Sequence, residues 1–160
     1  MNEKNYLFNP FVCKNANEKE IEQLYKQIFD NLIDEPITLY HYAQNVEIYA
    51  NLCYLTGEVI ARLTRDIINL KTTIEIKKAL KLADERKNWN KEDGKPPAMA
   101  YFEARATNYC KDDINRLADK NCSLKRFQNA YKSIEEKMNA LKKKMESIKF
   151  EEFNNWFKIR

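Results

Sequence analysis

Glycine and proline are scarce in this sequence, which has 160 residues but only 2 Gly and 4 Pro. A usual glycine content of about 7% would give roughly 11 glycines. With so few, the chain cannot form a phosphate-cradling loop of the G-x-x-x-x-G-K type or a G-x-G-x-x-G turn. Tight hairpin turns need residues with positive φ, so a β-rich fold with many turns is also disfavoured. These absences favour long, uninterrupted helices.

Metal-ligating residues and long apolar runs are also sparse. The four cysteines include no C-x-x-C pair, and His41 is the only histidine, so we predict no metal site. No run approaches the roughly 18 apolar residues that a membrane span requires. Residues 1–10 lack the apolar core of a signal peptide. We therefore expect a cytoplasmic protein with reduced cysteines and no membrane partner.

No group of residues has the spacing of a catalytic site. The adjacent carboxylates Asp112 and Asp113 point to different faces of a helix, as do Glu151 and Glu152. The serines lack the glycines of a nucleophile elbow, and His41 has no partner in a recognisable motif. We predict that the protein is not an enzyme and needs no cofactor.

The apolar pattern divides the chain into helical segments. From Ile21 to Ile33 apolar residues recur every three or four positions, which predicts an amphipathic helix that ends before Pro36. Two further helices are predicted on either side of a polar turn that contains Gly94. The segments of this single elongated domain (1–160) are a leader (1–16), a short helix (17–34), two long helices (38–90 and 97–150) and an aromatic tail (151–160).

Each long helix carries an apolar seam with alternating spacings of four and three residues, from Tyr42 to Ile74 and from Leu117 to Ile148. Upstream of Leu117 the apolar residues continue in a shifted register. Helices of about 50 residues are about 75 Å long, and a short linker makes them antiparallel neighbours. We therefore predict an all-α fold, a long antiparallel two-helix coiled-coil hairpin.

Additional apolar residues lie outside these seams. Ile48, Leu52, Leu55 and Val59 form a second stripe on the first long helix, and the short helix has an apolar face to cover it. This predicts a three-helix bundle at the open end of the hairpin. Ile68 and Ile76 add apolar surface elsewhere on that helix, which favours a homo-oligomer.

Basic residues gather at the turn and on the third helix. The net charge is +4, and residues 71–95 hold eight basic and five acidic side chains, a net charge of +3. Lysines there can follow phosphates while a tryptophan stacks on a base. The alternative is a solvated hairpin end in which the tryptophan completes the packing. The candidate nucleic-acid-binding residues at this turn are Lys77, Lys78, Lys81, Arg86, Lys87, Trp89 and Lys91.

A second basic stretch, residues 125–149, holds eight basic and three acidic residues, a net charge of +5. Lys142, Lys143 and Lys144 are its candidates for nucleic-acid contact. The alternative is the polar face of a coiled coil, where lysines also suit the last helical turns.

Three segments carry a resemblance to a known group: Tyr49-Ala50-Asn51-Leu52, Tyr101-Phe102-Glu103-Ala104-Arg105-Ala106 and Lys125-Arg126-Phe127-Gln128-Asn129-Ala130-Tyr131. Over residues 40–150 the chain resembles small helical-hairpin proteins of tailed phages, and among named groups the UvsY-type recombination mediators. The resemblance implies an oligomer that binds single-stranded DNA through Lys-rich arms and supports a recombinase.

We therefore expect a non-enzymatic accessory protein of a phage or mobile element, in the cytoplasm of a bacterial host, that assists recombination or replication. The alternative is a protein-interaction module, such as an inhibitor of a host defence protein, or a structural coiled-coil scaffold. In that case the aromatic tail makes the contact, through Phe150, Phe153, Trp156 and Phe157.

Overall fold

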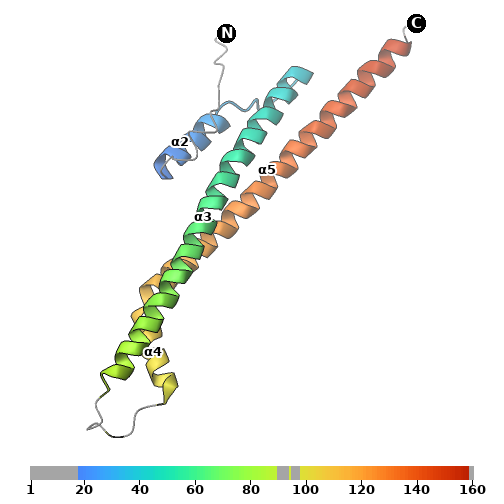
Figure 1. Cartoon of the computed structure of the whole chain (residues 1–160). Coiled ribbons are helices and arrows are strands. Elements are labelled where there is room, and N and C mark those ends of the chain that lie inside the picture. Colours follow the sequence, from blue (N-terminus) through green and yellow to red (C-terminus); the bar gives the residue numbers. More distant parts are fainter. Residues whose placement is uncertain (1–17, 90–93, 95–97, 159–160) are drawn as a thin grey trace. The chain divides into compact units, whose positions relative to one another are not determined.

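The structure is a computed structural model that describes residues 18–89, 94 and 98–158, with the side chains of residues 18 and 155–158 left out. It contains helices α2 (Glu18–Phe29), α3 (Leu39–Lys87), α4 (Met99–Tyr109) and α5 (Lys111–Lys158) and, within the described residues, no strand (Figure 1). The prediction of an all-α fold is confirmed. The long helices α3 and α5 pack together as a helical hairpin.

The chain divides into two compact units. Unit 1 comprises residues 1–60 and 127–160, and therefore holds α2, the first part of α3 and the last part of α5. Unit 2 comprises residues 61–126 and holds the rest of α3, all of α4 and the start of α5. Each unit has its own set of contacts.

Both predicted seams lie where the helices pack. Every seam residue from Leu117 to Ile148 is half-buried, and apart from Ser123 every other residue over 121–150 is exposed. The seam from Tyr42 to Ile74 contains no exposed residue. The alternation of four and three residues thus identified the packed face of each long helix correctly.

The core of unit 1 is apolar and draws on three helices. Ile28 of α2 and Leu55 of α3 are both 0% exposed, and Leu52 is 2% exposed. Ile134 of α5 packs against them, together with further side chains of α2 and α3. Thr56 is also fully buried, and its hydroxyl donates to the Leu52 carbonyl oxygen at 2.6 Å.

α2 ends at Phe29, five residues before the predicted end at 34. The reason is Asn45, which is 4% exposed. Its side chain forms hydrogen bonds with both the backbone N–H and the backbone carbonyl of Ile33. The Ile33 N–H donates to Asn45 Oδ1 at 2.8 Å, and Asn45 Nδ2 donates to the Ile33 carbonyl at 2.8 Å. A side chain from another helix therefore replaces the helical hydrogen bonds that the sequence pattern predicts.

The prediction of one continuous helix over 97–150 is wrong at Cys110, where α4 ends and α5 begins. Phe102, Ala106 and Cys110 are buried at spacings of four, and a repeat of four drifts around a helix. The break at Cys110 (φ −95°, ψ 11°) restores the phase of the Leu117 seam. The shifted register upstream of Leu117 was the sequence signal for it.

α5 also continues to Lys158, through most of the predicted tail. No glycine or proline occurs after Pro97, so nothing in the sequence stops the helix. None of the described helices is long and apolar enough to cross a membrane.

Candidate nucleic-acid interface

Two lysines of the predicted turn site are engaged in ion pairs inside unit 2. Lys77 Nζ lies 2.6 Å from an Asp113 carboxylate oxygen. Hydrogen bonding to that carboxylate raises the pKa of Lys77, and a hydrogen bond to Glu85 raises the pKa of Lys81. Both side chains are charged at neutral pH, but their charge is offset by a carboxylate of the same unit.

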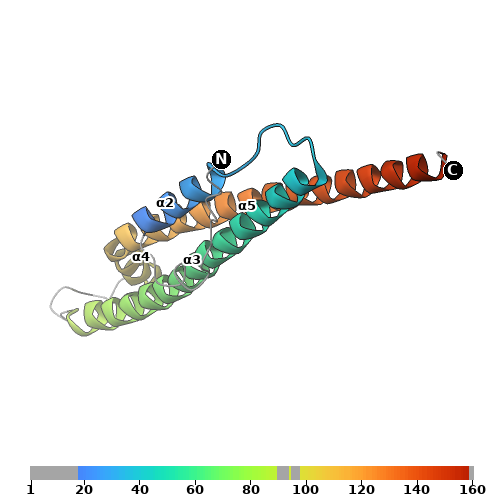
Figure 2. The same cartoon turned by 90° about the horizontal axis from the view of Figure 1, so that it is seen from above.

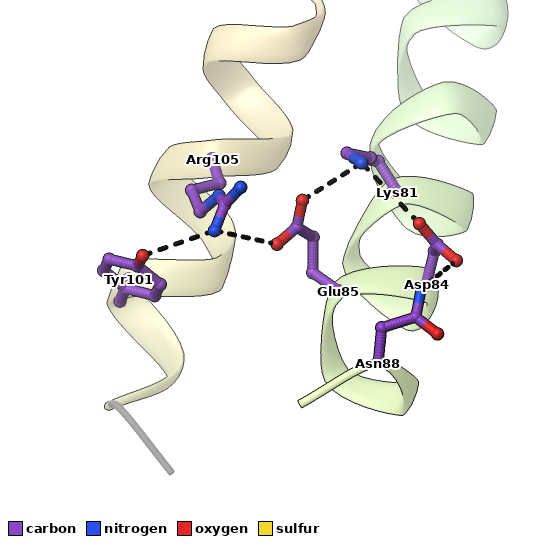
Figure 3. A network of polar contacts seen from close by, with 6 residues as sticks. All are labelled: Lys81, Asp84, Glu85, Asn88, Tyr101 and Arg105. Carbon is purple, nitrogen blue, oxygen red and sulfur yellow. Dashed lines mark hydrogen bonds and ion pairs between the residues drawn. The ribbon is translucent and has the colours of Figure 1, made fainter. Parts of the chain in front are cut away.

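Glu85 is the centre of this network (Figure 3). One of its carboxylate oxygens lies 3.0 Å from Lys81 Nζ on the same helix, and the other lies 3.2 Å from Arg105 on α4. Arg105 also donates to the hydroxyl of Tyr101 at 3.3 Å. Lys81 Nζ lies 5.5 Å from the ring centre of Tyr109. These contacts hold α4 against α3.

Trp89 is half-buried, and its ring packs edge-on against Phe102 at 6.1 Å between ring centres. Its indole Nε1 is buried without a hydrogen-bond partner among the described residues. This position agrees with the alternative in which the tryptophan completes the packing at the end of the hairpin. It leaves less of the ring for a nucleic-acid base.

The other turn candidates differ among themselves. Arg86 and Lys87 are exposed and form no ion pair with any residue that the structure describes. Lys78 is half-buried. Lys91 lies outside the described residues. The predicted turn site is therefore reduced to a few available cations. The exposed rings of the same unit, Tyr101 and Tyr109, already contact Arg105 and Lys81.

The three consecutive lysines of α5, in unit 1, point in different directions. Lys144 Nζ lies 5.5 Å from the ring centre of Tyr42, on the side of α5 that packs on α3. Lys144 also lines an open groove of about 800 Å³ with Asp30, Asp34 and Lys137. Lys142 and Lys143 are exposed. Successive residues of a helix are 100° apart, so consecutive lysines do not form one surface.

Two aromatic residues share a helix face with Lys142 and Lys143. Phe150 is 67% exposed and Phe153 is 60% exposed. Residues seven apart lie two turns along the same face, which aligns Lys142 with Lys149 and Lys143 with Phe150. Lys149 and Phe153 are four apart and also neighbours. We call these five residues the α5 outer face, because the half-buried seam residues Leu141, Met145 and Ile148 lie on the other side.

Sequence reasoning assigned the lysines and the aromatic residues to different functions because it ended the helix near Phe150. The longer helix joins them (Figure 2). Trp156 and Phe157 lie in the helix, but their side chains are outside the described part of the chain. The repeat of seven residues from Lys142 to Lys149 was the available signal.

Buried titratable groups lie elsewhere in unit 1. Burial raises the pKa of Tyr25 and of Cys53. The Tyr25 hydroxyl contacts Thr56, whose own proton is directed to the Leu52 carbonyl. Tyr25 therefore donates in this hydrogen bond and stays protonated. Among the described residues, no cluster of three or more His, Cys, Asp or Glu side chains is arranged to hold a metal ion.

No protein-family model, no curated protein and no solved structure matches this chain. The functional argument therefore depends on the residues of the chain itself.

Proposed function

We propose that this protein binds single-stranded DNA through the α5 outer face, as a non-enzymatic accessory protein of a phage or mobile element. The observation that carries the proposal is the exposure of Phe150 and Phe153 beside Lys142, Lys143 and Lys149 on one helical face. Single-strand-binding proteins combine cations that follow the backbone with aromatic rings that stack on bases. The proposal shifts the main contact from the turn to α5.

The difference in ion pairing between the lysines of α5 and those of the turn supports placing the site on α5. Glu146 lies on the same side of α5, but no ion pair joins Lys142, Lys143 or Lys149 to a carboxylate within the described part of the chain. Lys77 and Lys81, in contrast, already have carboxylate partners. A cation that must leave such a partner gains less from a phosphate. Arg86 and Lys87 remain as secondary contacts.

In this proposal the protein holds single strands for a recombinase or replication protein, as the resemblance to the UvsY-type mediators implies. In unit 1, α5 packs with α2 and α3 and carries the α5 outer face. An oligomer repeats the binding face along the strand. The cytoplasm of a bacterial host is the expected location.

The test is fluorescence anisotropy with a labelled single-stranded oligonucleotide and a duplex of the same sequence, at low and at physiological salt. Each cation that displaces a counterion from a single strand contributes a slope of about −0.7 in log affinity against log salt. We expect a preference for single strands and a slope near −2 for three lysines.

Two variants separate the contribution of lysine charge to binding from that of aromatic stacking on the α5 outer face. Replacing Lys142, Lys143 and Lys149 by Glu should abolish binding. Replacing Phe150 and Phe153 by Ala leaves the charge unchanged and should weaken single-strand binding about tenfold or more, because each stacked base contributes roughly 1–3 kcal/mol. Duplex binding should change little with the second variant.

The matched control replaces Lys78, Arg86 and Lys87 by Glu, which alters the net charge by the same amount at the turn. If this control abolishes binding and the α5 variant does not, the site is at the turn and our proposal is wrong. If the wild type does not bind at low salt, DNA is excluded. Phe150 and Phe153 are then candidates for docking a helix in the groove of a partner protein.

A further inference from the structure

The α5 outer face has a definite length, because its five residues belong to one helix. Lys142 and Phe153, the first and the last of them, are eleven positions apart in α5. At a rise of about 1.5 Å per residue, this separation is about 16.5 Å. A stacked strand advances about 3.4 Å per nucleotide, so about five nucleotides cover the face. A more extended strand covers it with fewer.

Acidic residues lie where the face would continue toward the start of α5. Glu135 and Glu136 are both exposed. They precede Lys142 and Lys143 by seven residues each, which places them two turns away on the same side of the helix. The nearby Lys132 is already paired with Glu136, its Nζ lying 3.9 Å from the carboxylate. A strand that passes Lys142 in this direction therefore meets carboxylates, which repel its phosphates.

The environment of Cys53 on α3 confirms that Glu135 and Lys142 share one side of α5. Burial raises the pKa of the Cys53 thiol most, Glu135 raises it further, and Lys142 lowers it. Such effects fall off over a Debye length of about 10 Å, so both charges lie near Cys53 within unit 1. The charge along this side of α5 therefore changes sign between the two residues. Glu146, which lies beside the lysines, is outnumbered by the three of them.

At the other end of the face, the length of the helix sets the limit. α5 ends at Lys158, sixteen positions after Lys142. The distance between these two positions along the helix is about 24 Å, which corresponds to about seven stacked nucleotides. The rest of α5 after Phe153 can therefore add only about two nucleotides to the five.

We infer that the ligand of the α5 outer face is a short single-stranded segment of about five nucleotides, such as a gap, a loop or the overhang of a duplex. The inference rests on the proposed function and adds the length and the position of the strand. The strand lies along α5 between Lys142 and Phe153 and leaves the helix before it reaches Glu135. Aromatic rings stack on unpaired bases, so paired segments on either side of the strand stay off the face.

The test is fluorescence anisotropy of the full chain at low salt, with labelled oligothymidines of two, five and ten nucleotides. The five-nucleotide strand should bind at least tenfold more tightly than the two-nucleotide strand, which cannot reach both the rings and the lysines. The ten-nucleotide strand should gain at most about sixfold over five nucleotides, since it offers a five-nucleotide site six registers. A hairpin with a five-nucleotide overhang should bind like the five-nucleotide strand, and the same hairpin with a blunt end should bind much more weakly.

Glu135→Lys combined with Glu136→Lys tests the acidic end of the site. This variant should increase the preference for ten over five nucleotides several-fold, because the strand can continue along α5. The matched control combines Glu151→Lys with Glu152→Lys, an equal change of charge within the length of the face. It should strengthen binding to both strands by a similar factor. Circular dichroism verifies that both variants retain their helices.

The outcomes separate this inference from the proposed function. If no oligonucleotide binds at low salt, both are wrong. If single strands bind but the affinity per register keeps rising to ten nucleotides, the proposed function stands and the short site is wrong. The short site is also overturned if the variant at Glu135 and Glu136 keeps the length preference of the wild type, or if the blunt hairpin binds as tightly as the overhang.

Discussion

Units 1 and 2 contain the same two long helices but are stabilised differently. In unit 1 a third helix, α2, closes an apolar core around Ile28, Leu52 and Leu55. In unit 2 the packing residues are fewer, and ion pairs such as Lys77–Asp113 and Lys120–Asp66 join the helices. Salt does not weaken the burial of apolar surface, whereas it weakens exposed ion pairs. We therefore expect unit 1, with the larger apolar core, to be the more stable of the two.

The largest expected effect is the loss of a fully buried side chain from unit 1. Ile28 is 0% exposed, and Ile28→Ala should lower the free energy of unfolding by about 2–5 kcal/mol. Urea denaturation followed by circular dichroism measures it. Ile37→Ala, at an exposed isoleucine, is the control and should change it by less than about 0.5 kcal/mol. Equal effects of the two substitutions would show that α2 does not close the core.

The cysteines report local opening of each unit. Cys53 in unit 1 is 8% exposed, Cys110 in unit 2 is 1% exposed, and Cys122 is exposed. We expect Cys110 to react with a thiol reagent about tenfold faster than Cys53, because buried thiols react after local opening. The raised pKa of Cys53 acts in the same direction. Peptide mass spectrometry over time measures each rate.

Static exposure alone predicts the reverse order for these two cysteines. Cys122 provides the rate for an accessible thiol in the same sample. In 1 M salt the Cys110 reaction should accelerate, since screening weakens the ion pairs of unit 2, while the Cys53 rate should stay constant. If Cys53 reacts faster, unit 2 is the more stable of the two.

Tyr25 tests the polar part of the unit 1 core. Tyr25→Phe removes one hydrogen bond to Thr56 and should cost about 1 kcal/mol. The pKa of Tyr25 is raised by burial, so the folded state holds its proton more tightly than the unfolded state. Its contribution is complete below pH about 10 and is lost as the pH rises through the folded-state pKa. Thermal unfolding between pH 8 and 11.5 should show a steeper decline for the wild type than for Tyr25→Phe.

The smallest effect concerns Lys120, which occupies a seam position and lies 2.6 Å from Asp66. Such exposed pairs contribute about 0–1 kcal/mol, and a leucine would add apolar burial at the same place. Lys120→Leu should therefore leave the free energy of unfolding within about 0.5 kcal/mol of the wild type, or raise it. A large loss in urea denaturation would mean that the ion pair stabilises unit 2 more than its exposure indicates.

The candidate functional residues also differ between unit 2 and unit 1. Lys77 and Lys81 are good candidates by sequence, but ion pairs within unit 2 occupy both. Phe150 and Phe153 were predicted to contact a protein, yet the extended α5 places them beside Lys142 and Lys149. A sequence pattern ranks residues by type and spacing. It does not reveal which opposite charge, 36 positions away for Lys77, will lie within reach.

The sequence by itself determined the all-α class and the packed face of each long helix, because periodicity and the lack of glycine and proline act locally. The tertiary structure decided where α2 ends, since Asn45 bonds to Ile33 from another helix. It also decided the break at Cys110 and the pairing of Lys77 with Asp113. Such features depend on the register between segments far apart in the chain, which only their packing fixes.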